Sequence, residues 1–173
     1  MHVKHLLVTA VLTLSAPFAG AQTYDEALAV FDEARQSGEQ THPGYAKALA
    51  AFQPLADGGD ARAQYHVGVM HLYGLGGAEF DQWIGMQWIK RAAEGGYHTA
   101  QSFMGLMVEK GDGTMTLLGD DHALEWYRKG AEGGHCVAVR RLVRAYEQGE
   151  LGLAKDPAQA DTWRTRLESC SSR

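Results

Sequence analysis

The feature that most constrains the fold of this chain is a pair of adjacent glycines that recurs three times at nearly equal spacing. The segments "LADGGDARAQ", "AAEGGYHTAQ" and "GAEGGHCVAV" each contain the pair, and an alanine follows the second glycine by four residues. These alanines, Ala63, Ala100 and Ala138, are 37 and 38 residues apart. Glycine tolerates a left-handed backbone, so each pair can end one helix and let the next begin within a few residues. A repeat of this length predicts helical hairpins stacked into a solenoid.

Each repeat unit is expected to contain two helices. In the first helix an apolar residue follows the alanine by four positions and a glycine follows it by eleven, a spacing that puts the apolar side chains on one helical face. The apolar residues are Val67, Met104 and Leu142. The second helix carries a tryptophan that we expect to pack between hairpins, at Trp88, Trp126 or Trp163. An aspartate stands near the start of each second helix as a predicted cap, at Asp81, Asp121 and Asp156.

The segment before the first complete unit reads as a divergent hairpin. "YAKALAAFQPLADGG" resembles a second helix, with Phe52 at an aromatic position and Pro54 interrupting it, and "TYDEALAVFDEARQSG" is amphipathic without the glycine pattern. It is therefore predicted to be a divergent or capping repeat. The fold class predicted is all-α, a right-handed α/α solenoid of about four helical hairpins. The units are expected at about residues 22–59, 60–96, 97–134 and 135–173.

The repeat pattern resembles a known family. "A-x-x-x-Φ-G-x-x-x-x-x-G", with Φ apolar, followed by "D-x-A-x-x-W-Y-x-x-x-A-x-x-G" is similar to the Sel1-like repeat, a relative of the tetratricopeptide repeat. The resemblance covers roughly residues 44–170 and is strongest in "DHALEWYRKGAEGG". Two departures are visible: Val143 stands where the family has glycine, and the loop "GDGTMTLLGDD" carries one extra residue.

The first 21 residues have the layout of a secretory signal peptide. A basic start at Lys4 precedes an apolar run from Leu6 to Leu14 and a small-residue stretch ending at Ala21. The alternative, a membrane anchor, is disfavoured because the apolar run is too short to span a bilayer comfortably. We expect cleavage before Gln22, which leaves residues 22–173 as one Sel1-like repeat domain in the periplasm, with no membrane span after cleavage.

Charge argues against a nucleic-acid partner. The first 21 residues hold one lysine and no acid, so the rest of the chain has 15 basic and 21 acidic side chains. Neutralising phosphates requires a basic face, which this balance does not favour.

The two cysteines, Cys136 and Cys170, form an even pair, which in an exported protein suggests a disulfide. They fall at the start and end of the last predicted hairpin, and helix-to-helix bonds of this kind occur in cysteine-rich members of the family that the chain resembles. Two thiols, or a bond between molecules, remain the alternatives.

Residues typical of catalysis are not arranged in any pattern that we recognise. There is no G-x-S-x-G elbow, no Ser-x-x-Lys and no Cys-x-x-Cys, and the glycine-rich loops lack a following Lys-Ser/Thr. His66 and His71 are five residues apart, whereas a metal-binding pair on a helix prefers four, so packing is the favoured interpretation. We expect no enzyme activity, no cofactor and no metal site.

A concave face built from the first helices is the expected binding surface, by analogy with tetratricopeptide proteins. The predicted partner-binding residues are Tyr65, Val69, Leu72, Tyr73, Leu106, Lys110, Arg140, Arg141 and Arg144. An aromatic-apolar end beside arginines resembles an interface hot spot. The alternative is that the tyrosines pack between hairpins and the arginines only solvate their helix.

The resemblance implies a non-enzymatic protein-binding module. Short periplasmic Sel1-like proteins include immunity proteins against secreted phospholipase toxins, and the specific hypothesis is such an inhibitor. The second hypothesis is a periplasmic adaptor for envelope or cell-wall machinery.

Overall fold

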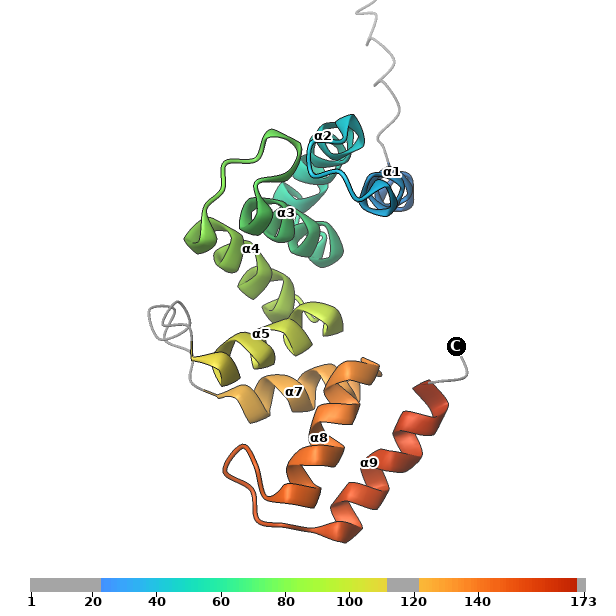
Figure 1. Ribbon diagram of the computed structural model, residues 1–173, viewed down its shortest axis with the longest axis vertical. Coiled ribbons are helices and arrows are strands. Elements are labelled where there is room, and N and C mark those ends of the chain that lie inside the picture. Colours follow the sequence, from blue (N-terminus) through green and yellow to red (C-terminus); the bar gives the residue numbers. More distant parts are fainter. Residues whose placement is uncertain (1–22, 112–121, 171–173) are drawn as a thin grey trace, which may run out of the picture.

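The computed structural model describes residues 23–111 and 122–170, and in these residues it contains α helices, one 3-10 turn and no strand. The eight helices form four hairpins that follow one another along the stack (Figure 1). The helices are α1 (Tyr24–Ser37), α2 (Pro43–Asp57), α3 (Ala61–Tyr73), α4 (Gln82–Glu94), α5 (His98–Lys110), α7 (Ala123–Glu132), α8 (Cys136–Gln148) and α9 (Pro157–Cys170). The short 3-10 turn η1 spans Leu75–Gly77. The predicted all-α solenoid of hairpins is confirmed.

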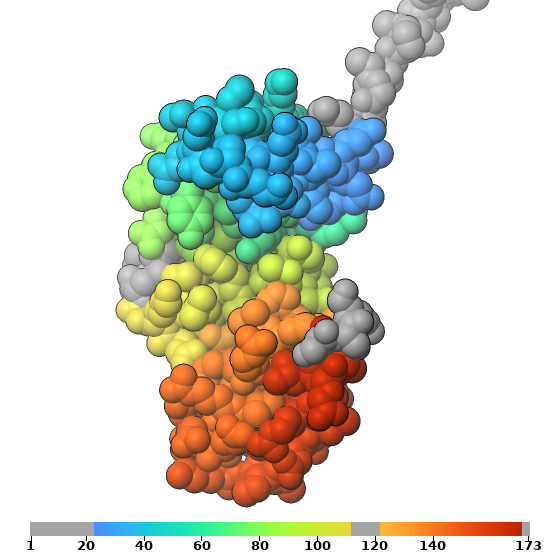
Figure 2. Space-filling model, turned by 45° about the vertical axis from the view of Figure 1, so that its right-hand side comes forward, coloured from blue at the N-terminus to red at the C-terminus, as the bar shows by residue number. Residues whose placement is uncertain are grey.

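The stack is curved. α1 and α9, at its two ends, lie on the same side, while α4 and α5 form the middle (Figure 1). In the space-filling view the N-terminal helices project beyond the middle of the stack (Figure 2). Within the described residues, none of the helices combines the length and the apolar character needed to cross a bilayer. The predicted signal peptide and Asp121 lie outside the described residues.

The glycine pairs end the second helices as the sequence predicts. Gly59, Gly96 and Gly134 have φ of +94°, +89° and +84°. The residue after each pair donates its N–H to a carbonyl five residues earlier, as Asp60 does to Leu55 over 2.9 Å. This hydrogen bond satisfies a carbonyl that the helix end would otherwise leave unpaired.

Aspartate caps start several helices. The carboxylate of Asp60 accepts the N–H groups of Arg62 and Ala63, and that of Asp81 accepts the N–H of Ile84. Asp156 accepts the N–H of Gln159 at 3.0 Å. The predicted caps at Asp81 and Asp156 are therefore confirmed, and each fixes where its second helix begins.

The repeated small and apolar positions form the interior. The three alanines and Val67, Met104 and Leu142 are all fully buried. α3 and α4 approach each other closely at Gly68 and Gly85, because a Cβ on Gly68 would lie 2.7 Å from the Gly85 carbonyl oxygen. Val143, at the position equivalent to Gly68, is buried and packs in the last hairpin.

Each repeated tryptophan is covered by a cation three residues later. The charged groups of Arg91, Lys129 and Arg166 lie 5.0, 4.6 and 4.6 Å from the ring centres of Trp88, Trp126 and Trp163. Trp126 and Trp163 are buried and Trp88 is partly buried. The predicted packing role is thus confirmed, and the cation that shields each ring is an additional repeated feature.

Pro54 does not interrupt its helix, contrary to the sequence prediction. α2 continues through it to Asp57. A proline removes one N–H hydrogen bond, but Phe52 and Ala56 on either side are buried in the N-terminal core, and this packing holds the last turn in helical geometry.

His66 is a packed residue, as the sequence analysis favoured. Its ring is buried among Tyr24, Phe31 and Phe52, and its Nε2 lies 3.1 Å from the hydroxyl of Tyr24. Burial lowers the pKa of His66 to about 4, so the ring is neutral at pH 7.

Candidate functional site

A groove of about 690 Å³ runs over the first helices of the second, third and fourth hairpins. Most of its wall comes from one face of α5 and one face of α8, with single side chains from α3 and α7. The lining residues are Tyr65, Thr99, Ser102, Phe103, Leu106, Glu109, Lys110, Tyr127, His135, Val137, Arg140, Arg141 and Arg144. Apart from Tyr127 on α7 and His135 just before α8, the lining residues belong to first helices.

Six of the nine predicted partner-binding residues line this groove. They are Tyr65, Leu106, Lys110, Arg140, Arg141 and Arg144. The structure places the other three outside it. Val69 and Leu72 are partly buried and pack against the core formed by α4 and α5, while Tyr73 is 60% exposed at the end of α3. Leu72 is drawn inward because Gly85 leaves room for it on α4.

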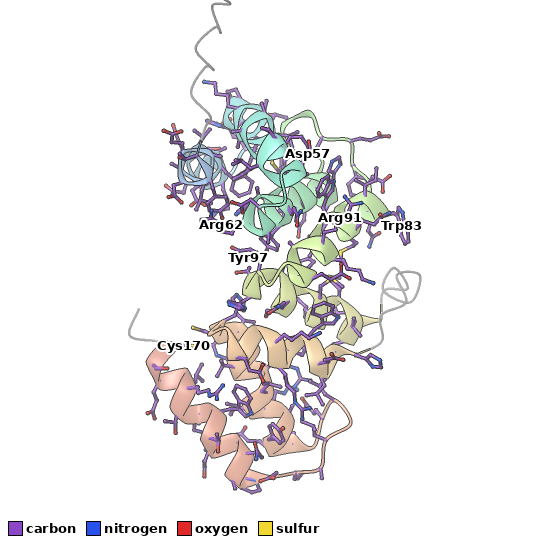
Figure 3. The ribbon with its side chains drawn as sticks, turned by 180° about the vertical axis from the view of Figure 1, so that it is seen from behind. Asp57, Arg62, Trp83, Arg91, Tyr97 and Cys170 are labelled. Carbon is purple, nitrogen blue, oxygen red and sulfur yellow. The ribbon has the colours of Figure 1, made fainter. Side chains whose placement is uncertain are left out.

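Aromatic rings form the end of the groove nearest α3. The ring of Tyr65 contacts those of Tyr97 and Phe103 edge to face, with centroids 5.4 and 6.2 Å apart. Burial raises the pKa of Tyr65 to about 12, so its phenol stays protonated. Tyr97 and Arg62 lie along the same edge of the stack, with Trp83 at the opposite edge (Figure 3). Tyr65 therefore packs between hairpins, which is the alternative that the sequence left open, whereas Tyr73 is exposed.

The centre of the groove is apolar and open to solvent. Leu106 on α5 is 38% exposed and Val137 on α8 is 57% exposed, whereas most apolar side chains of these two helices are buried or partly buried. Ser102 at the base is buried. Apolar groups left exposed inside a concave surface, with polar groups at its rim, are typical of a binding site.

A polar network joins α5, α7 and α8 along one wall. The guanidinium of Arg141 donates to both carboxylate oxygens of Glu109, at 2.9 and 2.5 Å, and the hydroxyl of Tyr127 donates to the same carboxylate at 2.8 Å. Glu150, after α8, forms ion pairs with Arg141 at 2.8 Å and with Arg144 at 3.1 Å. Since Arg141 is only 15% exposed, its charge is committed to holding the hairpins together.

The network fixes the protonation of its members. The hydrogen bonds from Arg141, opposed by burial, hold the pKa of Glu109 below its usual value. Burial, and then the hydrogen bond to Glu109, raise the pKa of Tyr127. The carboxylate of Glu109 is therefore ionised and the phenol of Tyr127 is protonated at neutral pH, so the charges of these two groups do not change near pH 7.

The remaining cations of the groove are more available. Arg144 pairs with Glu150 but is 68% exposed. Arg140 and Lys110 are exposed, and neither makes an ion pair with any carboxylate of the described residues. Of the three predicted arginines, Arg140 and Arg144 therefore keep surface for a partner, whereas Arg141 is largely internal.

Several lining residues were not predicted from the sequence. Phe103, Val137 and His135 belong to first helices or their starts, but the analogy did not select them. Tyr127 comes from a second helix, which the analogy treats as outside the concave face. The only available signal for Tyr127 is its place directly after Trp126, which turns its ring away from the tryptophan toward α5.

The described residues contain no cluster of three or more histidine, cysteine or acidic side chains that could hold a metal ion. Cys136 and Cys170 do not line the groove. They lie at the open end of the last hairpin, where α8 begins and α9 ends. Each is a thiol whose sulfur lies at the carbonyl oxygen of Gly134, at 3.8 Å for Cys136 and 3.5 Å for Cys170. The disulfide stays a prediction.

Comparisons with known proteins agree with the observed repeat. A family model described as Sel1 repeat matches residues 61–97, 98–135 and 138–160. The crystal structure of a Sel1 repeat protein from Oxalobacter formigenes is similar with a TM-score of 0.62 and 33% identity, covering 70% of this chain and 88% of that one.

A protective antigen present in uropathogenic Escherichia coli strains, displaying an SLR fold, is similar with a TM-score of 0.61 and 28% identity, covering 85% of this chain and 31% of that one. Chitin synthase regulatory factor 3 of Schizosaccharomyces pombe is 26% identical over 134 residues. The match spans 76% of this chain and only 14% of the length of that curated relative.

Proposed function

The chain belongs to the Sel1 repeat family, whose repeats form protein–protein interaction modules, and we propose that it is an exported module that holds a segment of a partner protein in the groove. The observation that carries this proposal is the exposed apolar centre of the groove, Leu106 and Val137, beside available cations. Proteins of this family are generally non-enzymatic binding scaffolds, and binding without chemistry is the role that we propose here.

The more specific role that we propose is inhibition of a secreted toxin of the phospholipase type in the periplasm. Support comes from the family resemblance, from the signal-peptide layout of residues 1–21 and from a groove sized for one partner segment. In this role the module would bind its partner tightly enough to block it, and the bound toxin would be inactive.

The alternative role is an adaptor for envelope or cell-wall machinery. It is favoured by one comparison, since the similar Schizosaccharomyces pombe protein is chitin synthase regulatory factor 3. In this role the bound partner would keep its activity and change its location or assembly.

The test is capture of partners from envelope fractions with the mature protein, beginning at Gln22, as bait. A Leu106→Asp variant places a charge in the apolar centre, and Phe80→Asp, at a 71% exposed site outside the groove, is the matched control. We expect a partner that is recovered by the native and control baits and lost by Leu106→Asp. Equal recovery by all three baits would show that the groove is not the binding site.

The activity of the captured partner then separates the two roles. A lipolytic enzyme whose activity disappears on adding the native module and persists with Leu106→Asp supports the inhibitor. An envelope-assembly protein whose activity is unchanged by the module supports the adaptor. Mass spectrometry of the protein purified from the periplasm tests export, because cleavage before Gln22 fixes the expected mass.

A further inference from the structure

The groove is basic although the chain as a whole is acidic. Four of its lining side chains are cations, Lys110, Arg140, Arg141 and Arg144, and one is a carboxylate, Glu109. The formal net charge of the chain is −5. A local excess of positive charge on an acidic protein restricts the kind of partner that can approach it, because the groove attracts acidic groups while the rest of the surface repels them.

The positive excess is concentrated on two side chains. Arg141 and Glu109 neutralise each other within the wall, and Arg144 shares Glu150 with Arg141. Lys110 and Arg140 have no carboxylate partner among the described residues, and both are exposed beside the groove. They come from different helices, α5 and α8, and both line the groove that contains Leu106 and Val137.

The apolar centre imposes a second requirement. Leu106 and Val137 are exposed in the same groove, which Phe103 also lines. Burying such side chains under a partner is favourable by about 25 cal/mol per Å² of apolar surface. A groove of about 690 Å³ accommodates a few side chains, not a whole domain face.

Resting on the proposed function, we propose that the partner segment held by the groove is an acidic peptide segment with an apolar anchor. The anchor side chain packs on Leu106 and Val137, and carboxylates on either side of it pair with Arg140 and Lys110. An arginine can bind a carboxylate through two parallel hydrogen bonds, which adds orientation to the charge. The internal Arg141–Glu109 pair holds α5 and α8 at the spacing that both contacts need.

The test uses a library of random twelve-residue peptides displayed on phage and selected on the immobilised mature protein. A double variant, Lys110→Glu/Arg140→Glu, reverses the two available charges. The matched control, Arg35→Glu/Lys47→Glu, makes the same change of charge at exposed positions of the N-terminal hairpin, away from the groove. Circular dichroism confirms that each variant is folded.

We expect the native and control proteins to enrich peptides that combine acidic residues with an aromatic or aliphatic residue. The affinity of the best peptide should fall at least tenfold on the charge-reversed variant and should fall as salt is raised. Neutral or basic selected peptides, an acidic bias that persists on the charge-reversed variant, or no enrichment would each overturn the proposal.

The captured protein partner separates this inference from the proposed function. A partner that is lost with Leu106→Asp but bound equally by Lys110→Glu/Arg140→Glu would overturn the acidic chemistry while the groove remained the binding site. A partner unaffected by either variant would overturn the proposed function itself.

Discussion

His66 lies face to face on Phe52, with ring centroids 4.8 Å apart and ring planes 8° apart. The stack joins the first helix of the second hairpin to the second helix of the divergent N-terminal hairpin. The rings of Tyr24 and Phe31 also pack against the imidazole, and its buried Nδ1 has no hydrogen-bond partner within residues 23–111 and 122–170. A titratable ring therefore sits in the contact that attaches the N-terminal hairpin to the stack.

This arrangement predicts that acid weakens the protein through His66. The pKa of His66 is about 4 in the folded protein, against an ordinary value of 6.5. The unfolded chain binds this proton first, so the free energy of unfolding falls as pH drops below about 6.5, and the loss is complete below about 4. The full effect is about 3 kcal/mol. Urea unfolding at several pH values measures it.

The control for this prediction is His66→Phe, which keeps an aromatic ring on Phe52 and removes the titration. Carboxylates also titrate in acid. The informative quantity is therefore the difference between the two proteins in how much their free energy of unfolding falls. The native protein should lose more stability than His66→Phe between pH 6.5 and 4.5. Equal slopes would mean that His66 is not the group that senses acid.

The repeat could be predicted from the sequence because its residues recur at fixed spacings. Gly59 ends a helix through its own backbone, a role that depends on neighbours a few residues away, and the buried Ala63 recurs at the same place in each first helix. The spacing of such residues shows a helical face without knowledge of the rest of the fold.

The groove could be predicted only in part, because contacts between hairpins decide which of its side chains are buried and which stay exposed. Arg140 and Arg141 are adjacent in the sequence, yet Glu109 from the preceding hairpin captures Arg141 and leaves Arg140 exposed. No local pattern marks Glu109 as the partner of Arg141.

The helix contact at Gly68 predicts a steric cost for one added methyl group. A Cβ there would lie 2.6 Å from Ile89 Cγ1 and 2.7 Å from the Gly85 carbonyl oxygen, which belongs to backbone. Gly68→Ala should lower the free energy of unfolding by about 1–2 kcal/mol, because overpacking outweighs the gain in helix propensity. Gly130→Ala, whose nearest contacts would be at 3.2 Å, should lose less. Urea denaturation compares them, and an equal or smaller loss at Gly68 would contradict the prediction.

The two thiols at the last hairpin predict a disulfide in the exported protein. Both sulfur atoms lie within 3.8 Å of the Gly134 carbonyl oxygen, so the two thiols lie at the same end of the hairpin. By the chain-entropy model it would add about 3–4 kcal/mol to the free energy of unfolding. Mass spectrometry after alkylation without reduction should find neither cysteine modified.

The matched measurement is thermal unfolding with and without reductant. The native protein should melt at a lower temperature when reduced, whereas Cys136→Ser should melt at one temperature in both conditions. Alkylation of both cysteines in protein taken from the periplasm would contradict the bond, and a reductant-sensitive dimer would indicate a bond between molecules.

The mostly buried charge of Arg141 is predicted to stabilise the groove wall, because it pairs with both Glu109 and Glu150. Arg141→Met leaves Glu109 and Glu150 facing each other without the cation between them, and should lower the free energy of unfolding by about 2–3 kcal/mol. Arg144→Met removes a side chain that is 68% exposed and should cost less than about 1 kcal/mol. Urea unfolding of both variants makes the comparison, and NMR titration of Glu109 should show its pKa rising more in Arg141→Met than in Arg144→Met. Equal losses of free energy of unfolding for the two variants would mean that Arg141 is as solvated as Arg144 and does not fix the spacing of α5 and α8.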